Sequence, residues 1–305
     1  MRICSLVPSG TQCLYVLGLG ESIVGVSHEC EIPPDVPQTP PRITRTVIDQ
    51  ERLSSEAIDR EVRTALERGA NLHRIDEEAL ARAAPDLVIT QGVCEVCAVG
   101  SAQAGEALRR LPRQPQIVSL HPHTLDDVFD EVRMLGQLTG RQREAGTLVA
   151  SCRRRLSRLA ARLAPATSHP RVVCLEWLEP PMAAGHWVPE MVALAGGDEV
   201  LGRPGAPSHY VGADELVAAD PDVLLLMPCG FPIERTRREL PQLAAQPWWA
   251  ALRAVRTDRI FLVNGPAYIQ CAGPRLIDGI EVLASLLHPE EFAGAPTSQD
   301  AAARV

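Results

Sequence analysis

The sequence predicts an α/β protein made of two three-layer lobes with mostly parallel sheets, joined by a long helix. One observation is a repeat: residues 85–90 and 221–226 both start with Pro-Asp, continue as an apolar run, and follow an Ala-rich helical stretch. An apolar run after such a break is typical of a buried parallel strand. The other observation is that strand and helix patterns alternate along the chain, which also indicates parallel sheets.

The first lobe is predicted from its turn and cap residues. Ser9 or Thr11 is a suitable N-cap for a helix that ends near Leu19, since glycines follow there. Five prolines between residues 33 and 41 exclude regular structure and predict an extended loop. We expect the strands at 3–7, 22–27, 85–90 and 116–120, and the later helices at 55–68, 76–84 and 101–111.

A helical connector and a second lobe follow. Thr124 starts a helix, Gly140 breaks it, and a second helix covers residues 141–163, about 35 Å at 1.5 Å per residue. The second lobe starts with a strand at 171–175 and ends with a strand at 260–263 and a helix at 274–287. The predicted divisions are 1–123 (first lobe), 124–164 (connecting helices), 165–290 (second lobe) and 291–305, a disordered tail rich in Ala and Thr.

Composition excludes several classes of function. The net charge of −8 argues against a nucleic-acid partner, and no run approaches the roughly 20 apolar residues of a membrane span. The apolar run in residues 1–10 is too short for a signal peptide, and nine cysteines, an odd number, suit a reducing compartment. We therefore expect a cytoplasmic protein.

Thiols gather at predicted strand ends, where ligands bind in open α/β sheets. Cys94 and Cys97 form a C-x-x-C after the first Pro-Asp strand, with Glu95 between them, and Cys229 follows the second Pro-Asp strand. This spacing suits a soft metal or a redox pair, but a closed zinc site needs four ligands. His28 and Cys30 are the candidates for the remaining two. The alternative is a pair of free thiols that pack a loop.

Residues 28–30 (His28, Glu29 and Cys30) follow the second strand. The imidazole and the thiol could be axial ligands of a metallocofactor. Equally, His28 could be a hydrogen-bonded anchor of the loop, and the sequence leaves both interpretations open.

Aromatic residues mark the start of the second lobe. Trp177 and Trp187 flank the turn after its first strand, and rigid aromatic rings suit stacking on a flat or macrocyclic ligand. The alternative is that Trp177 belongs to the core and only Trp187 faces outward. Further candidates for ligand contacts are Ser9, Arg45 (for an acidic group), Glu176, His186 and Tyr268, which could cap the cleft between the lobes. No nucleotide-binding loop, hydrolase elbow or metalloprotease motif is present, so we expect no enzyme.

Short motifs in a fixed order resemble the helical-backbone (class III) substrate-binding proteins of cobalamin and iron-complex importers. The resemblance covers residues 2–288. Its motifs are at residues 5–11 (SLVPSGT), 24–27 (VGVS) with Pro33-Pro34, 84–89 (APDLVI), 180–181, 185, 194–198 (LAGGD) and 273–275. The family implies two Rossmann-like lobes, a rigid helical hinge, a ligand held in the cleft between the lobes, a monomer, and an ABC permease as partner.

Within that family the chain is most similar to a cobalamin-binding branch. The matching segments are residues 27–30, 94–99, 175–178, 185–191 and 227–231. Exported members of the family carry a signal peptide, and we expect none in this chain. The resemblance therefore implies the fold more directly than it implies a permease partner.

Our hypothesis is a cytoplasmic, non-enzymatic protein that binds a corrinoid (cobalamin-like) or related metal complex in the cleft. Trp187 and Tyr268 would stack on the ligand, and His28, Cys30 or the pair Cys94 and Cys97 would contact its metal. The alternative is a zinc- or iron-binding enzyme or metallochaperone whose cysteines hold the metal outright. A third is an exported binding protein without its leader.

Overall fold

The computed structural model of the protein describes residues 1–92, 101–292 and 300–305. These residues form two compact units, which we describe separately. The first unit comprises Met1–Arg52, Arg60–Pro122 and Asp127–Val149; the second comprises Leu53–Asp59, His123–Asp126 and Ala150–Val305. The predicted α/β class with mostly parallel sheets is confirmed.

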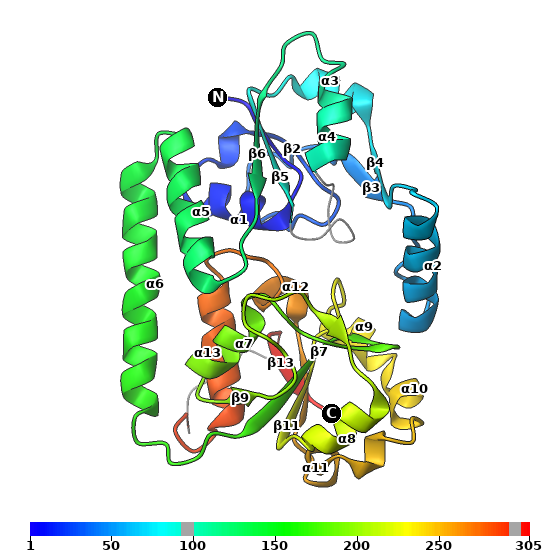
Figure 1. Cartoon of the computed structure of the whole chain (residues 1–305). Helices are drawn as coiled ribbons and strands as arrows, with labels where there is room; N and C mark the ends of the chain where they lie inside the picture. Colours follow the sequence, from blue (N-terminus) through cyan, green and yellow to red (C-terminus); the bar gives the residue numbers. More distant parts are fainter. Residues whose placement is uncertain (93–100, 293–299) are drawn as a thin grey trace. The chain divides into compact units, whose positions relative to one another are not determined.

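The first unit is built on a parallel four-stranded sheet in the order β2-β1-β5-β6 (Figure 1). Its strands are β1 (Ile3–Ser5), β2 (Ile23–Val26), β5 (Leu87–Gln91) and β6 (Gln116–Leu120). A small antiparallel pair joins β3 (Thr44–Thr46) to β4 (His73–Ile75). The strand predicted at the first Pro-Asp motif is therefore confirmed as a central strand.

Two helices of the first unit begin in different ways. The prediction of Ser9 or Thr11 as the N-cap of the first helix is wrong: both residues lie inside α1, and Val7 is the N-cap without a side-chain hydrogen bond. Pro8 begins this helix instead, where a missing backbone N–H costs nothing, and Gly18 follows its end with a φ of 73°. Asp76 caps α3 by accepting a hydrogen bond from the Ala79 N–H at 2.8 Å. The helical elements are α1 (Pro8–Val16), η1 (Gly20–Ser22), α2 (Ser55–Glu67), α3 (Glu77–Ala83), α4 (Ser101–Leu108) and α5 (Leu125–Leu138).

The second unit contains a larger, mixed sheet in the order β10-β8-β7-β11-β12-β13, with β9 also paired to β7. Its parallel strands are β7 (Arg171–Leu178), β9 (Asp198–Glu199), β11 (Val223–Leu226) and β12 (Ile260–Val263). Its antiparallel strands are β8 (Pro181–Ala183), β10 (His209–Tyr210) and β13 (Ala302–Arg304).

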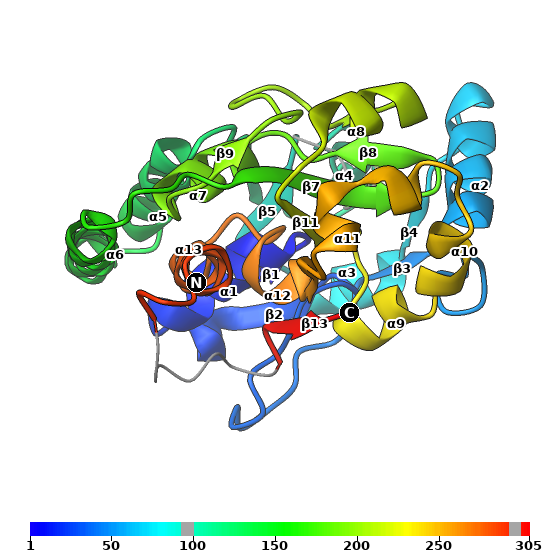
Figure 2. The ribbon, with the colours of Figure 1, turned by 90° about the horizontal axis from the view of Figure 1, so that it is seen from below.

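Helices cover this sheet, and α6 and α13 lie side by side in both views (Figures 1 and 2). After α9 and α10 the chain reaches Trp248 and Trp249, which are buried in the core of this unit. The helical elements are α6 (Gln142–Leu163, of which Ala150 onward belongs to this unit), α7 (Val188–Leu194), α8 (Ala213–Ala219), α9 (Ile233–Arg237), α10 (Leu240–Ala244), η2 (Trp249–Ala251), α11 (Arg253–Arg256), α12 (Gly265–Tyr268) and α13 (Leu276–Leu287).

The end of the chain differs from the expected disordered tail. Residues 302–304 form β13, which pairs antiparallel with β12 from Phe261 to Val263. The composition of this segment, mostly alanine, gives no strand signal of its own. Backbone pairing to an existing strand edge orders it instead.

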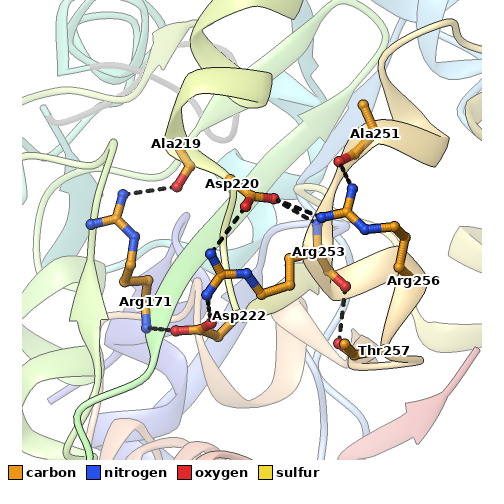
Figure 3. Close-up of polar contacts among 8 residues, drawn as sticks. All are labelled: Arg171, Ala219, Asp220, Asp222, Ala251, Arg253, Arg256 and Thr257. Carbon is orange, nitrogen blue, oxygen red and sulfur yellow. Dashed lines mark hydrogen bonds and ion pairs between the residues drawn. The ribbon is translucent and has the colours of Figure 1, made fainter.

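The Pro-Asp motif has a structural role that its sequence did not reveal (Figure 3). Asp222 accepts a hydrogen bond from the Arg171 N–H at 2.9 Å, and the Arg171 guanidinium donates to the Ala219 carbonyl at 2.8 Å. Asp222 also pairs with Arg253 at 2.7 Å. This aspartate clamp fixes the start of β7 to the start of β11 and to the end of α8.

The first unit repeats the aspartate clamp. Asp86 accepts a hydrogen bond from the Arg2 N–H at 2.9 Å, and the Arg2 guanidinium donates to the Ala83 carbonyl at 2.8 and 2.9 Å. The hydrogen bond from Arg2, followed by the charge of Arg113, lowers the pKa of the Asp86 carboxyl. In both units the residue after the helix adopts the left-handed conformation, with φ of 39° at Ala84 and 34° at Asp220.

Removing the second clamp should destabilise the protein. Asp222→Ala deletes the acceptor of the Arg171 N–H, so we expect the free energy of unfolding to fall by about 1 kcal/mol. Asp222→Asn retains a carbonyl oxygen for that bond and should lose less. Denaturant titrations followed by circular dichroism measure the change. Glu290→Ala, at an exposed carboxylate of the same unit, is the control, and an equal loss there would contradict a specific clamp.

Candidate ligand-binding site

Four candidate side chains lie at or beyond the carboxyl ends of parallel strands in the second unit. In an open α/β sheet, ligands bind beyond the carboxyl ends of the strands. Glu176 and Trp177 lie at the end of β7, Cys229 follows β11, and Gln270 follows the short helix after β12. All four side chains are half-buried.

Glu176 is held by a short polar chain. Its Oε2 accepts a hydrogen bond from the Ser208 hydroxyl at 2.8 Å, and the Ser208 Oγ accepts one from the Gly185 N–H at 3.1 Å. Burial raises the pKa of the Glu176 carboxyl, although the Ser208 hydrogen bond opposes that change. The ionised Glu176 carboxylate is therefore a positioned hydrogen-bond acceptor. When it is protonated, the same carboxyl group can donate a hydrogen bond.

His186 lies in a constrained loop before α7. Its φ of 52° is left-handed, and its backbone is fixed by hydrogen bonds to the Ala206 carbonyl (2.6 Å) and from the Gly205 N–H (2.9 Å). Gly185 precedes it because a Cβ there would lie 2.3 Å from the Ala206 carbonyl oxygen. The loop geometry fixes where the imidazole lies.

The His186 imidazole has unused hydrogen-bonding capacity. Its Nδ1 is buried and has no hydrogen-bond partner among the described residues. Burial lowers the pKa of His186, and the charge of His123, whose ring centroid is 5.6 Å away, lowers it further. The ring is therefore neutral at pH 7, the state in which an imidazole binds a metal.

Trp187 is more enclosed than predicted. Its side chain is 8% exposed and its indole N–H donates to the Ile269 carbonyl at 2.7 Å. Its ring centroid lies 5.8 Å from that of His186. Trp187 thus packs against the His186 ring and links its loop to the Ile269 backbone.

Gln270 was not singled out by the sequence, yet it organises the loop after β11. Its Nε2 donates to the Met227 carbonyl at 2.6 Å, and its Oε1 accepts from the Gly230 N–H at 3.2 Å. Cys229 lies inside this loop, and its N–H donates to the Glu176 carbonyl at 2.9 Å. Of the cysteines that the structure describes, Cys229 has the one side chain that is not buried.

Trp177 anchors the first turn of α2. Its indole N–H donates to the Ser55 carbonyl at 3.2 Å, and its ring lies 5.2 Å from that of Phe231. The Ser55 N–H and hydroxyl both donate to Glu239 Oε2, at 3.1 and 2.8 Å. These contacts explain why Leu53–Asp59 belong to the second unit.

Glu239 and Arg235 form a buried ion pair beneath that turn. The guanidinium Nη1 is 2.5 Å from Glu239 Oε1, and the two side chains are 9% and 6% exposed. Arg235 also donates to the Leu53 carbonyl and lies 4.0 Å above the Phe231 ring. Burial would raise the pKa of Glu239, but hydrogen bonds from Arg235 and Ser55 outweigh it and lower that pKa.

Tyr268 is also engaged within the second unit. Its side chain is 9% exposed, its hydroxyl donates to Asp300 Oδ2 at 3.0 Å, and the Arg275 guanidinium lies 4.6 Å above its ring. Stacking on a ligand through this ring would require it to give up the contact with Arg275.

In the first unit, His28 is a hydrogen-bonded residue at the end of β2. Its Nδ1 lies 2.7 Å from the Thr44 hydroxyl oxygen, its Nε2 lies 3.2 Å from Glu29 Oε1, and its ring is 5.3 Å from that of His73. This arrangement matches the loop-anchor interpretation of His28.

Cys30 is a buried thiol. Its Sγ accepts a hydrogen bond from the Thr11 hydroxyl at 3.0 Å and lies 3.3 Å from the Ser27 hydroxyl. Burial raises the pKa of Cys30, so it remains protonated, whereas metals bind the thiolate. Ser9 is buried in the first turn of α1, and Arg45 lies on β3 directly opposite Arg74.

The remaining predicted thiols lie outside the described residues: Cys94, Glu95 and Cys97. Within residues 1–92, 101–292 and 300–305, no three His, Cys, Asp or Glu side chains are placed to hold a metal together. Among the described helices, none combines the length and the apolar character that crossing a membrane requires.

Comparison with known proteins gives the family. A sequence model described as a periplasmic binding protein matches residues 3–267. The chain belongs to the periplasmic binding protein family. The predicted resemblance to its class III members, which serve cobalamin, iron-complex and heme uptake, is confirmed.

Relatives with curated names support the same family. The vitamin B12-binding protein of Vibrio cholerae serotype O1 is 25% identical, with 94% of this chain and 88% of that protein aligned. An uncharacterised ABC transporter substrate-binding lipoprotein, YvrC of Bacillus subtilis, is 23% identical over 95% of this chain and 81% of its own length. These periplasmic binding proteins bind solutes and are not enzymes, which confirms the non-enzymatic prediction and disfavours the metalloenzyme alternative.

Solved structures share the fold. The periplasmic heme-binding protein RhuT from Roseiflexus sp. RS-1 has a TM-score of 0.70 at 24% identity, covering 95% of this chain and 98% of that one. The vitamin B12-binding protein BtuF of Vibrio cholerae has a TM-score of 0.65 at 21% identity, covering 94% and 96%. These structures show that the protein shares the fold of periplasmic binding proteins.

The predicted cytoplasmic location is wrong. The Bacillus relative is a lipoprotein, and the matching solved structures are periplasmic proteins. The odd number of cysteines does not indicate a reducing compartment here, because most of the described thiols are buried. Burial raises the pKa of four of them: Cys4, Cys30, Cys152 and Cys174. Buried, protonated thiols are inert in either redox environment, so their odd number does not report the compartment.

Breaking the buried ion pair should release the first turn of α2. Glu239→Gln leaves Arg235 buried without its carboxylate, so we expect the free energy of unfolding to fall by about 3 kcal/mol. The amides of Leu53–Asp59 should also exchange hydrogen faster, as measured by mass spectrometry. Glu234→Gln, an exposed carboxylate on α9, is the control. Unchanged exchange in Glu239→Gln would show that other contacts hold this turn.

Proposed function

We propose that this periplasmic binding protein captures a corrinoid, such as vitamin B12, and presents it to an ABC permease. Support comes from the curated relatives, of which the Vibrio protein is named for vitamin B12 and the Bacillus protein for an ABC transporter. The observation that carries the proposal is the neutral, incompletely hydrogen-bonded imidazole of His186, positioned by a strained loop and supported by Trp187.

The chemistry of a corrinoid suits these residues. Its cobalt accepts an axial nitrogen ligand, and imidazole is a common nitrogen ligand of transition metals. Its amide side chains need acceptors, and the Glu176 carboxylate, held by the Ser208 hydroxyl, supplies one at the end of β7. Cys229 is the accessible thiol of this set. His28 and Glu29 of the first unit remain candidate ligand contacts. The buried Cys30 thiol instead hydrogen-bonds within the first unit.

Heme is the competing ligand. Its iron also accepts an axial imidazole, and several matching structures are heme-binding proteins. Corrinoid and heme differ at the periphery, since heme carries carboxylates and a corrinoid carries mainly amides. Glu176 would repel a heme carboxylate when ionised, which favours the corrinoid.

An absorbance titration of the reduced protein tests the ligand. With aquocobalamin we expect saturation at one equivalent and a shifted corrin band, because a nitrogen or sulfur ligand replaces the axial water. Hemin titrated in parallel should bind more weakly. A flat response to aquocobalamin together with saturation by hemin would replace the corrinoid proposal with a heme one.

The axial role of His186 has its own test. His186→Asn tolerates the left-handed backbone and removes the imidazole, so the fold should persist while the band shift disappears. His169→Asn, at an exposed histidine, is the control. Because burial lowers the pKa of His186, protonation competes with the metal only at acidic pH, and the wild-type shift should persist below the pKa of free imidazole. A band shift that is unchanged in His186→Asn would exclude His186 as the axial ligand of the cobalt.

A further inference from the structure

The second half of α6 concentrates positive charge on an acidic protein. Residues 150–163 contain five arginines and no acidic residue, whereas the whole chain has a net charge of −8. Arg154, Arg158 and Arg162 follow each other at intervals of four, so they share one exposed face of the helix. Like charges at this spacing destabilise a helix, and a bound anion would relieve that repulsion.

Two of the five arginines are neutralised by carboxylates. Arg155 lies 2.6 Å from Asp278 and 2.6 Å from Glu281, both on the adjacent α13 (Figures 1 and 2). Arg153 pairs with Asp126 at 2.9 Å. These pairs hold α6 against its own unit.

Arg158 and Arg162 are different. Arg162 donates to the Glu291 carbonyl at 2.9 and 3.1 Å and lies 4.0 Å above the Phe292 ring, contacts that orient the guanidinium but leave its charge uncompensated. Within the described part of the chain, Arg158 has no carboxylate within ion-pair distance.

These two arginines line a groove of about 310 Å³. Its lining combines charged side chains with two apolar ones, Leu159 and Phe292. The described residues that line the groove are Arg155, Arg158, Leu159, Arg162, Glu281 and Phe292. This volume accommodates a phosphate group together with a short apolar substituent.

We propose that this groove binds a phosphate monoester or diester through Arg158 and Arg162. Guanidinium groups match phosphate oxygens in bidentate geometry, and an oriented guanidinium loses less entropy on binding. Leu159 and Phe292 contact the carbon atoms next to the phosphate. The phosphate belongs either to a free metabolite or to a lipid headgroup. This site is independent of the corrinoid proposal, since it uses no residue at the strand ends.

The experiment compares two arginines of the same exposed face. Binding of glycerol 3-phosphate is measured by calorimetry at low salt, and co-sedimentation is measured with phosphatidylcholine vesicles with and without phosphatidylglycerol. Arg158→Gln should weaken binding about tenfold or more, since it removes a charge-assisted hydrogen bond. Arg154→Gln, with the same charge and exposure but outside the groove, should have little effect. Circular dichroism verifies that both variants fold.

Each outcome decides the proposal. Loss of binding in Arg158→Gln but not in Arg154→Gln supports the proposed site. Binding of glycerol 3-phosphate identifies the ligand as a free phosphate, and binding to the phosphatidylglycerol vesicles identifies it as a lipid headgroup. Equal loss in both variants would mean diffuse attraction of anions to the helix and would overturn a discrete site. Absence of binding to either probe by the wild-type protein would also overturn it.

Discussion

The aspartate clamp is the constraint on which both units depend. In each unit an aspartate at the start of a central strand binds the backbone N–H at the start of its neighbour, and an arginine ties the preceding helix to the same point. Fixing the amino ends leaves the carboxyl ends free to carry loops of different length and composition. Chemistry can therefore vary at one edge of each sheet without disturbing the alignment of its strands.

Much of the fold was predictable because local signals dominate there. The apolar runs after Pro85 and Pro221 could only be buried strands, and the second connecting helix was predicted to within one residue of its observed start. The clamp was not predictable from the sequence. Asp86 lies 84 residues from Arg2, and Asp222 lies 51 residues from Arg171, so no local pattern links the partners. Long-range backbone pairing likewise decided β13.

The candidate site shows the same division. The sequence located Glu176 and Cys229 near the ends of β7 and β11, because position along or after a strand is a local property. It could not distinguish aromatic residues that face a ligand from those that support the fold. Trp177 donates to Ser55, 122 residues away, and Trp187 donates to Ile269, 82 residues away. Gln270 was missed because an amide that organises a loop through backbone groups has no motif.

The terminal strand moves the edge of the second unit's sheet from β12 to β13, a strand of three residues. β13 occupies the outer edge of β12, where Val305 also donates to the Ile260 carbonyl and Asn264 donates to the Ala301 carbonyl. An exposed edge with the apolar residues of β12 would be a template for pairing with another molecule. Purification tags should therefore leave residues 301–305 intact, because a chain shortened before Ala302 would offer that edge to its neighbours.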